Sequence, residues 1–178
     1  MNSRERMIAA INHETLDRVP TDIWATPEVW QKLKEHFGQD ADIYELLHID
    51  GMAHVGPKYI GPPLPAVSED ETVDYWGIRT KKVAYCAGTY NEMSFRPLSD
   101  DQTIDDLEQY KWPTADWFDY SEMRAAAEIA HQKQIVMCGY MALFFQHNKL
   151  RGLKESLVDP FLRPEFTRHL LNRISACV

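Results

Sequence analysis

Three side chains that could do acid–base or polar chemistry occur at the ends of predicted buried strands. Asp22 lies near the end of residues 18–24, His54 near the end of residues 51–55, and Tyr140 just after residues 134–138. Parallel strands of an α/β barrel bring their carboxyl ends to one face, and active sites form there. We therefore predict that Asp22, His54 and Tyr140 are catalytic residues.

Each of these three residues also has a structural interpretation. A carboxylate on a buried strand is costly unless it is paired, so Asp22 is catalytic, binds substrate or is locked to an arginine. The alternative for His54 is a core histidine bonded to a backbone carbonyl. The alternative for Tyr140 is a packed ring with its hydroxyl bonded elsewhere.

Aromatic and acidic residues near these positions are candidates for substrate binding. Trp24 ends the first predicted strand, and Trp76, Tyr90 and Glu92 lie in a β-rich stretch that could close the mouth of a pocket. Packing of that stretch onto a barrel would need the same aromatic residues, so a structural role stays open for them.

The chain lacks the common cofactor and metal motifs. It contains no GxGxxG, no GxxxxGK[ST] and no GxSxG. Its seven histidines and three cysteines form no pair at metal-ligand spacing, so we predict no metal site within the chain. Cys138, inside an apolar stretch, is expected to be a small buried hydrophobe.

Periodicity and capping residues predict alternating helices and strands. Helices are expected over residues 2–13, 27–38, 42–48, 103–112, 120–132, 143–150 and 164–175. Capping boxes are expected at Asn2 with Glu5 and at Thr103 with Asp106. Pro27 should open the second helix, and Trp30 should lie on its apolar face. Strands are expected over residues 18–24, 51–55 and 134–138, with an antiparallel ribbon over about 72–96 whose strands span 72–78, 82–85 and 89–95. Buried strands that alternate with helices indicate an α/β protein with a parallel sheet.

Composition limits the partners. The 178 residues are 44% hydrophobic and 26% charged, with a formal charge of −8, so a nucleic-acid partner is not expected. No apolar run reaches the length of a membrane helix, and the first residues do not form a signal peptide. With scattered cysteines, this favours a cytoplasmic protein. The stretch 100–122 holds eight acidic residues and one lysine, which predicts a solvated outer face or a docking surface for a basic partner.

Several short motifs, taken in order, point to a family. They include SRER and AAINHE followed by DRVP near the start, LHID at 47–50, DYWG at 74–77, GTYNE at 88–92, PL at 97–98, TIDDLE at 103–108 with WP at 112–113, and LRG at 150–152. In this set the chain resembles the uroporphyrinogen decarboxylase superfamily, which includes cobalamin-dependent methyltransferases. The matches run from residue 3 to about 174.

The resemblance implies a (β/α)8 TIM barrel. Such barrels need about 250 residues, so residues 1–178 are expected to form an incomplete N-terminal portion with an inserted β-ribbon. Exposed sheet edges would then be completed by self-association or by a chain that carries the C-terminal half.

The resemblance also frames the function. Uroporphyrinogen decarboxylases carry arginines that grip the carboxylates of a tetrapyrrole, whereas residues 21–30 here contain none. We therefore expect a methyltransferase that acts on a corrinoid or a small methylated substrate. The complete protein would use zinc and a corrinoid, with no cofactor held by this chain alone. The alternatives are uroporphyrinogen decarboxylation and a non-catalytic half that serves binding or assembly.

Overall fold

The computed structural model describes residues 1–86, 88–139 and 141–177. The chain divides into two compact units: unit 1 is Met1–Lys58 with Tyr120–Tyr140, and unit 2 is Tyr59–Asp119 with Met141–Val178. Helices and strands are mixed in both units, and the strands of the described residues form three small sheets without a closed barrel.

Unit 1 begins with three helices whose starts follow from the sequence. Helix α1, Ser3–Ile11, has the predicted capping box, in which the Asn2 side chain accepts from the Glu5 amide and the Glu5 carboxylate accepts from the Asn2 amide. Helix α2, Pro27–Phe37, begins with proline in its first turn and ends at Gly38. Helix α3, Ile43–Leu46, is a single short turn capped by Asp42.

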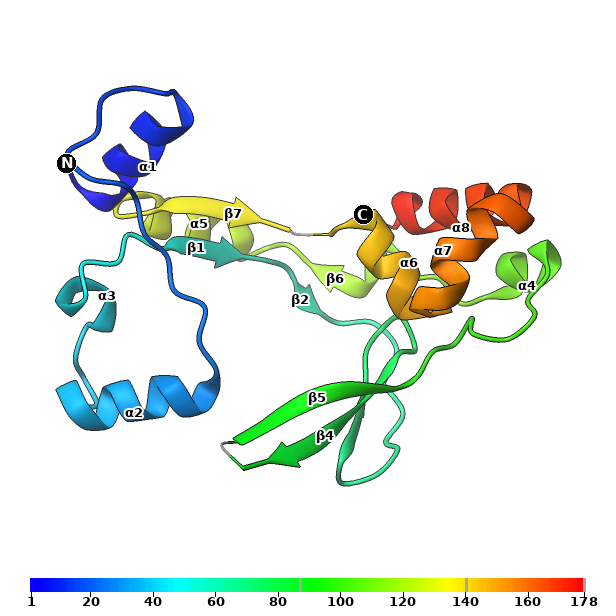
Figure 1. Cartoon of the computed structure of the whole chain (residues 1–178). Helices are drawn as coiled ribbons and strands as arrows, with labels where there is room; N and C mark the ends of the chain where they lie inside the picture. Colours follow the sequence, from blue (N-terminus) through cyan, green and yellow to red (C-terminus); the bar gives the residue numbers. More distant parts are fainter. Residues whose placement is uncertain (87, 140, 178) are drawn as a thin grey trace. The chain divides into compact units, whose positions relative to one another are not determined.

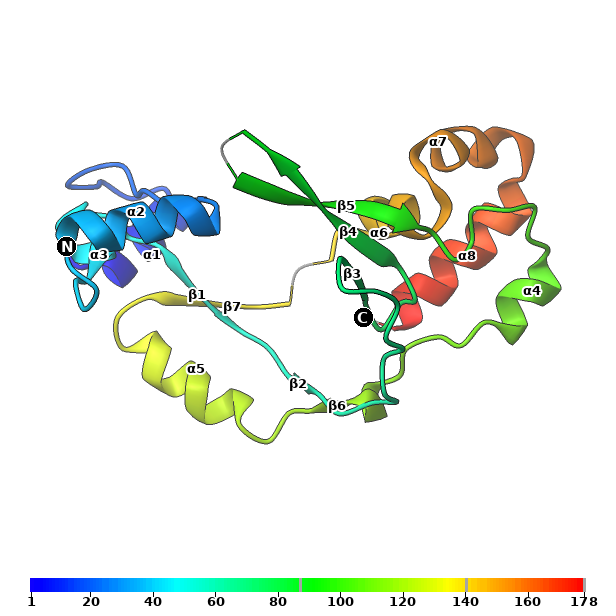
Figure 2. The same ribbon diagram turned by 90° about the horizontal axis from the view of Figure 1, so that it is seen from below.

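The sheet of unit 1 is a parallel pair of strands. Strand β1, Met52–Val55, pairs with β7, Ile135–Cys138, in a register that sets His54 opposite Met137. Helix α5, Met123–His131, packs against both strands, and α1 packs against β7 (Figures 1 and 2). Two parallel strands with a helix packed on both form the basic element of an α/β sheet.

The apolar core of unit 1 is thin. Among its described residues, only Ala9 and Ile43 are buried hydrophobic side chains. Neither α2 nor α5 buries a residue, although both carry an apolar face. In the described part of the chain, each strand of the β1–β7 pair also has one edge without a strand partner. Parallel sheets are normally covered by helices on both faces. In unit 1 the two-stranded parallel sheet has few buried apolar contacts of this kind.

Unit 2 contains the ribbon and a helical layer. Strands β3, Glu71–Val73, β4, Arg79–Tyr85, and β5, Gly88–Phe95, form an antiparallel sheet, as predicted for about 72–96. The short strands β2, Lys58–Tyr59, and β6, Phe118–Asp119, form a second sheet. The helical elements are α4, Ile104–Gln109; η1, Ala115–Trp117; α6, Leu143–Arg151; α7, Leu153–Leu162; and α8, Pro164–Ala176.

A continuous hydrophobic core lies within unit 2. Helix α8 supplies one side chain about every four residues, as its spacing predicts. The core residues are Trp76, Ile78, Leu98, Leu107, Leu150, Phe166, Leu170 and Ile174. A buried ion pair between Arg151 Nε and Asp159 Oδ2, at 2.7 Å, ties α6 to α7, and Arg151 also donates to the Leu98 carbonyl.

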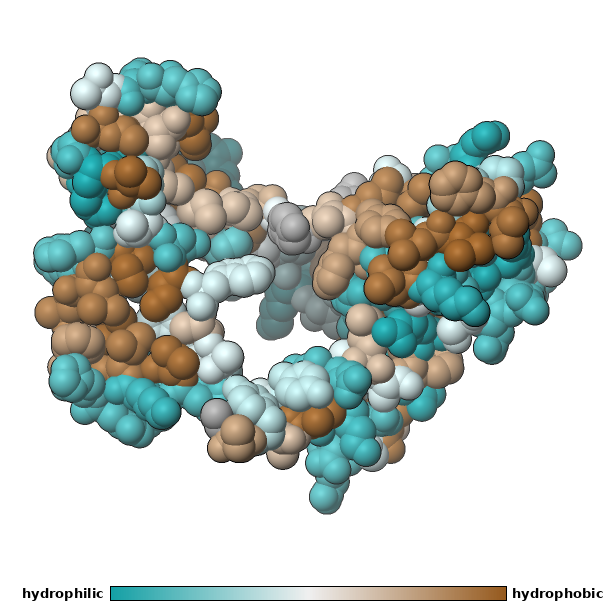
Figure 3. Space-filling model, viewed as in Figure 1, coloured by the Kyte–Doolittle hydropathy of each residue, from teal (hydrophilic) through white to brown (hydrophobic). Residues whose placement is uncertain are grey.

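Helix α7 has an inverted pattern of polarity. Ser156 and Asp159 are buried, whereas apolar side chains face outward. The exposed apolar residues of this helix are Leu153, Leu157, Val158, Phe161 and Leu162. Figure 3 shows hydrophobic surface over the helical layer of unit 2 and also between α2 and α3 of unit 1.

Three sequence predictions need correction. Residues 18–24 form no strand: among them only the Thr21 carbonyl accepts backbone bonds, from the amides of Asp50 and Gly51, which precede β1. The strand predicted over residues 72–78 ends at Val73, because the Asp74 carboxylate accepts from the amides of Trp76 and Ile78 and turns the chain. Helix α7 was not predicted, since Pro160 lies inside it and proline disfavours a helix interior.

Most carboxylates of the acidic stretch are exposed and Asp119 is half-buried, which fits both the solvated face and the docking surface. Asp105 and Glu108 of α4 are exposed. Thr103 is the N-cap of this helix, and the Asp106 carboxylate completes the capping box. Bonds from the Thr103 hydroxyl and amide hold the pKa of Asp106 below its ordinary value. Glu108 forms ion pairs with His169 and Arg173 of α8.

Stability of unit 2 should fall in mild acid because of His147, which is 1% exposed. Burial lowers its pKa from the ordinary 6.5; the Asp159 carboxylate opposes this shift, and Arg151 adds to it. The unfolded chain therefore takes up this proton at a higher pH than the folded chain. The contribution of neutral His147 is complete above about pH 6.5 and is lost progressively below it.

Urea midpoints between pH 5 and pH 8 measure this effect. We expect the urea midpoint of the parent chain to decrease below pH 6.5. This decrease should be smaller in His147→Gln than in His36→Gln, the control at an exposed histidine. An identical pH dependence in both variants would show that His147 does not titrate as described.

Candidate functional site

A network of arginine–aspartate ion pairs anchors the start of β1 in unit 1. Arg6 Nε donates to Asp17 Oδ1 at 2.6 Å, and Arg6 Nη1 donates to Asp50 Oδ1. Arg18 donates to both oxygens of Asp50, at 2.7 and 3.0 Å, and to the His48 carbonyl at 2.9 Å. The Thr21 amide adds a bond of 3.0 Å to Asp50. Two of the three arginines in the opening motifs, Arg6 and Arg18, are therefore engaged by carboxylates, and the third, Arg4, bonds to His131.

The network keeps its carboxylates ionised. Burial opposes ionisation of Asp50, but the Thr21 amide, Arg6 and Arg18 outweigh it and hold the pKa of this carboxyl below its ordinary value. Hydrogen bonds from Arg6 and the terminal amine hold the pKa of Asp17 well below its ordinary range. The bond to Asp17 is the main reason that the pKa of Arg6 is raised, with Asp50 contributing and burial opposing. A buried carboxylate with two guanidinium partners is a stable anchor.

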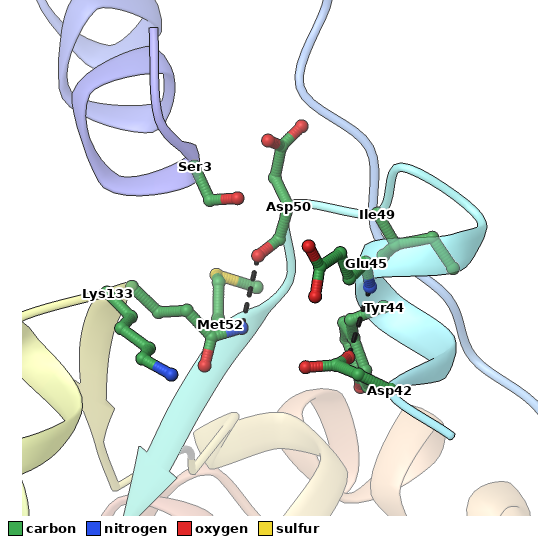
Figure 4. Close-up of a pocket in the computed structure, with 9 residues that line it drawn as sticks. Ser3, Asp42, Tyr44, Glu45, Ile49, Asp50, Met52 and Lys133 are labelled. Carbon is green, nitrogen blue, oxygen red and sulfur yellow. Dashed lines mark hydrogen bonds between the residues drawn. The ribbon is translucent and has the colours of Figure 1, made fainter.

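A polar pocket of about 420 Å³ lies at the amino-terminal ends of β1 and β7. Figure 4 shows Ser3, Asp42, Glu45 and Lys133 around it, with the Asp50 carboxylate pointing away. Gln134 lines the pocket and donates from Nε2 to the Asp50 carbonyl at 3.1 Å. The Asp50 carboxylate therefore belongs to the ion-pair network and does not face this pocket.

An aromatic pocket of about 440 Å³ lies between the loop after Thr21, helix α2 and helix α3. Trp30 of α2 stacks on Tyr44 of α3, with ring centroids 5.7 Å apart and planes 18° from parallel. Trp24 on the loop is 98% exposed. The lining residues are Ile23, Trp24, Ala25, Thr26, Trp30 and Tyr44, and none carries a charge. This pocket contains one of the predicted substrate-binding residues, Trp24.

The predicted catalytic residues of unit 1 do not form a pair. Asp22 is exposed on a loop, and its Oδ1 accepts from the Ile23 amide at 2.9 Å. His54 is exposed on β1, so it is not the buried core histidine of the alternative interpretation. Among the described residues no hydrogen bond joins Asp22 to His54. The third predicted catalytic residue, Tyr140, lies outside the described residues.

Cys138 differs from its expected place. It ends β7 in an exposed position, because β7 has no neighbour on its outer edge among the described residues. The prediction of a buried thiol was therefore wrong.

The remaining predicted substrate-binding residues belong to unit 2. Trp76 is buried in the core, packed edge-on to Trp112, which supports its structural interpretation. Tyr90 and Glu92 are exposed on β5, and Glu92 lies opposite Lys81 of β4. The Tyr90 ring lies 6.2 Å from that of Tyr85.

A second aromatic pocket, of about 230 Å³, lies within unit 2. Its walls include Tyr59, Tyr75 and Trp117 together with the proline-rich stretch 62–65. The Tyr110 hydroxyl donates to the Trp76 carbonyl, and burial raises the pKa of Tyr110, with the Asp74 carboxylate adding to the shift. Arg79 and Lys111 also line this pocket, and each cation lies over an aromatic ring.

The described part of the chain does not bring three or more His, Cys, Asp or Glu side chains together in a way that could hold a metal ion. Among the described residues, no helix is both long and apolar enough to cross a membrane.

No family model, curated protein or solved structure matches this chain.

Sequence reasoning missed two residues of the aromatic pocket of unit 1, Trp30 and Tyr44. Trp30 was expected on the apolar face of α2, where spacing alone does not distinguish packing from ligand binding. Its stacking on Tyr44 depends on how α2 and α3 meet, which the periodicity of either helix does not specify.

Proposed function

We propose that this chain is the N-terminal portion of a (β/α)8-barrel protein of the uroporphyrinogen decarboxylase type. In this proposal the complete protein is a cytoplasmic methyltransferase that acts on a corrinoid or a small methylated substrate. The parallel β1–β7 pair with α5 packed on both strands supports the barrel. The strand edges without partners and the uncovered faces of α2 and α5 are consistent with further strands and helices.

One observation favours methyl transfer over decarboxylation of uroporphyrinogen. A polycarboxylate substrate needs arginines free to grip it, but Arg6 and Arg18 are both committed to Asp17 and Asp50. The pocket that contains Trp24 has no basic lining residue. Its aromatic, uncharged walls suit an apolar or methylated group better than a carboxylate.

The role of these residues in the proposal is binding and orientation. Trp24, Trp30 and Tyr44 hold the methylated group, and the Asp50 network fixes the loop that carries Trp24. Asp22, His54 and Tyr140 remain proposed catalytic residues. The described His, Cys, Asp and Glu side chains form no set that fits zinc, so we derive no step through zinc for this chain.

Titration of the full chain with methylcobalamin and with uroporphyrin I tests the proposal. We expect absorbance changes of methylcobalamin that saturate, and up to about tenfold weaker binding by Trp24→Ala, since a stacked aromatic pair contributes about 0.5–1.5 kcal/mol beyond the area that it buries. Phe161→Ala, at an exposed aromatic side chain of unit 2 that lines neither aromatic pocket, is the matched control and should bind as the parent chain does.

The other results would contradict methyl transfer in different ways. Tight binding of uroporphyrin I would instead support decarboxylation. Failure of both ligands to bind would support the non-catalytic binding or assembly half.

A further inference from the structure

The aromatic pocket of unit 1 exposes more aromatic surface than packing requires. Trp24 is 98% exposed, although a tryptophan side chain gains free energy by leaving water. Its neighbours Trp30 and Tyr44 are half-buried and line the same cavity of about 440 Å³. Trp30 and Tyr44 cover one face of each other by stacking, whereas the Trp24 ring is almost wholly in solvent, so both of its faces are open to a ligand.

The charges in the segment around this pocket are mostly negative. Between Thr21 and Ile49 the chain carries six acidic side chains, Asp22, Glu28, Glu35, Asp40, Asp42 and Glu45, against two lysines, Lys32 and Lys34. Asp22 directly precedes the lining residue Ile23, and Asp42 and Glu45 flank Tyr44. No lysine or arginine lines the pocket. An anion would meet net repulsion there, and a cation would be attracted.

Aromatic faces attract cations directly. A cation within about 6 Å of a tryptophan or tyrosine ring is stabilised by the ring quadrupole, and aromatic cages recognise quaternary ammonium ions in this way. Such ions are weakly hydrated and cannot donate hydrogen bonds, so they need no polar partner in the pocket. The uncharged lining of this pocket therefore suits a quaternary ammonium ion better than a metal ion or a primary amine.

We propose that the pocket formed by Trp24, Trp30 and Tyr44 binds a methylated ammonium cation. This inference rests on the proposed function in that it names the class of small methylated substrate at the same site. Rings supply the contact with the methyl groups, and the surrounding carboxylates supply the long-range attraction.

Calorimetric titration with choline tests the inference on the full chain, with its neutral isostere 3,3-dimethyl-1-butanol as the reference ligand. We expect choline to bind about two- to fivefold more tightly than the alcohol, since a cation–π contact at an exposed site contributes about 0.5–1 kcal/mol. Choline affinity should fall by a similar factor in Trp24→Ala and be partly kept in Trp24→Phe. It should be unchanged in Phe161→Ala, at an exposed aromatic side chain that lines neither aromatic pocket.

Two results would overturn the inference. Equal binding of choline and the alcohol would mean that the pocket recognises shape and not charge. Absence of choline binding by a chain that circular dichroism shows to be folded would mean that the pocket is not a cation site.

Failure of this inference can be told apart from failure of the proposed function. Choline binding without methylcobalamin binding would support the cation site and count against corrinoid-linked methyl transfer. Methylcobalamin binding without choline binding would count against the cation site and support corrinoid-linked methyl transfer.

Discussion

Replacing Asp50 with alanine is expected to unfold unit 1 while unit 2 stays folded. Asp50 is 1% exposed and bonds to Arg6, Arg18 and the Thr21 amide. Breaking a fully buried ion pair costs about 3–5 kcal/mol. The loss here should be smaller, because Arg6 keeps its bonds to Asp17 and the Arg18 side chain is 37% exposed. Unit 1 has few buried apolar side chains to offset such a loss, because among its described residues only Ala9 and Ile43 are buried hydrophobics.

Limited trypsin digestion measures this effect. Cleavage within residues 1–58 should become at least about tenfold faster in Asp50→Ala, since cleavage follows the population of the open form. Asp22→Ala, at an exposed carboxylate of the same segment, is the control and should digest like the parent chain. Equal digestion of Asp50→Ala and the parent chain would show that the network does not hold unit 1 together.

Replacing Leu170 with alanine should have the largest effect on unit 2. Leu170 is 0% exposed and lies in the core with Trp76 and Phe166. Truncation of a buried leucine removes its burial energy and leaves a cavity, at a cost of about 2–5 kcal/mol. We expect the urea midpoint, followed by tryptophan fluorescence, to fall accordingly.

Leu162→Ala is the matched control because it removes the same atoms from a side chain that is 75% exposed. Its effect should stay within about 0.5 kcal/mol. A loss equal to that of Leu170→Ala would mean that the outward apolar face of α7 is covered in solution.

Local signals in the sequence predicted many elements because each depends on near neighbours. The capping boxes that start at Asn2 and Thr103 both form, and Pro27 begins a helix. Residues 18–24 failed as a strand because strand formation needs a partner along its length. Among these residues only the Thr21 carbonyl accepts backbone bonds, from the amides of Asp50 and Gly51, which precede β1.

The candidate site was less predictable than the fold. Trp24 was identified by its place in the chain, but the pocket also needs Trp30 and Tyr44, which come from two helices. Trp76 appeared equally suited to a pocket and to a core, and it lies in the core. Asp22 was expected on a buried strand, where an unpaired carboxylate is costly. Asp22 is exposed instead, so the cost of burying a carboxylate no longer argues for a catalytic role of this residue.

The central claim is that the β1–β7 pair of unit 1 is a segment of a larger barrel sheet and lacks a core of its own. Hydrogen exchange of the full chain, followed by mass spectrometry, tests this claim most directly because it reports the opening of each segment separately. We predict strong protection in α6 and α8 of unit 2 and weak protection in β1 and β7. Protection of β1 and β7 as strong as that of α8 would contradict the claim and show that unit 1 is stable as it stands.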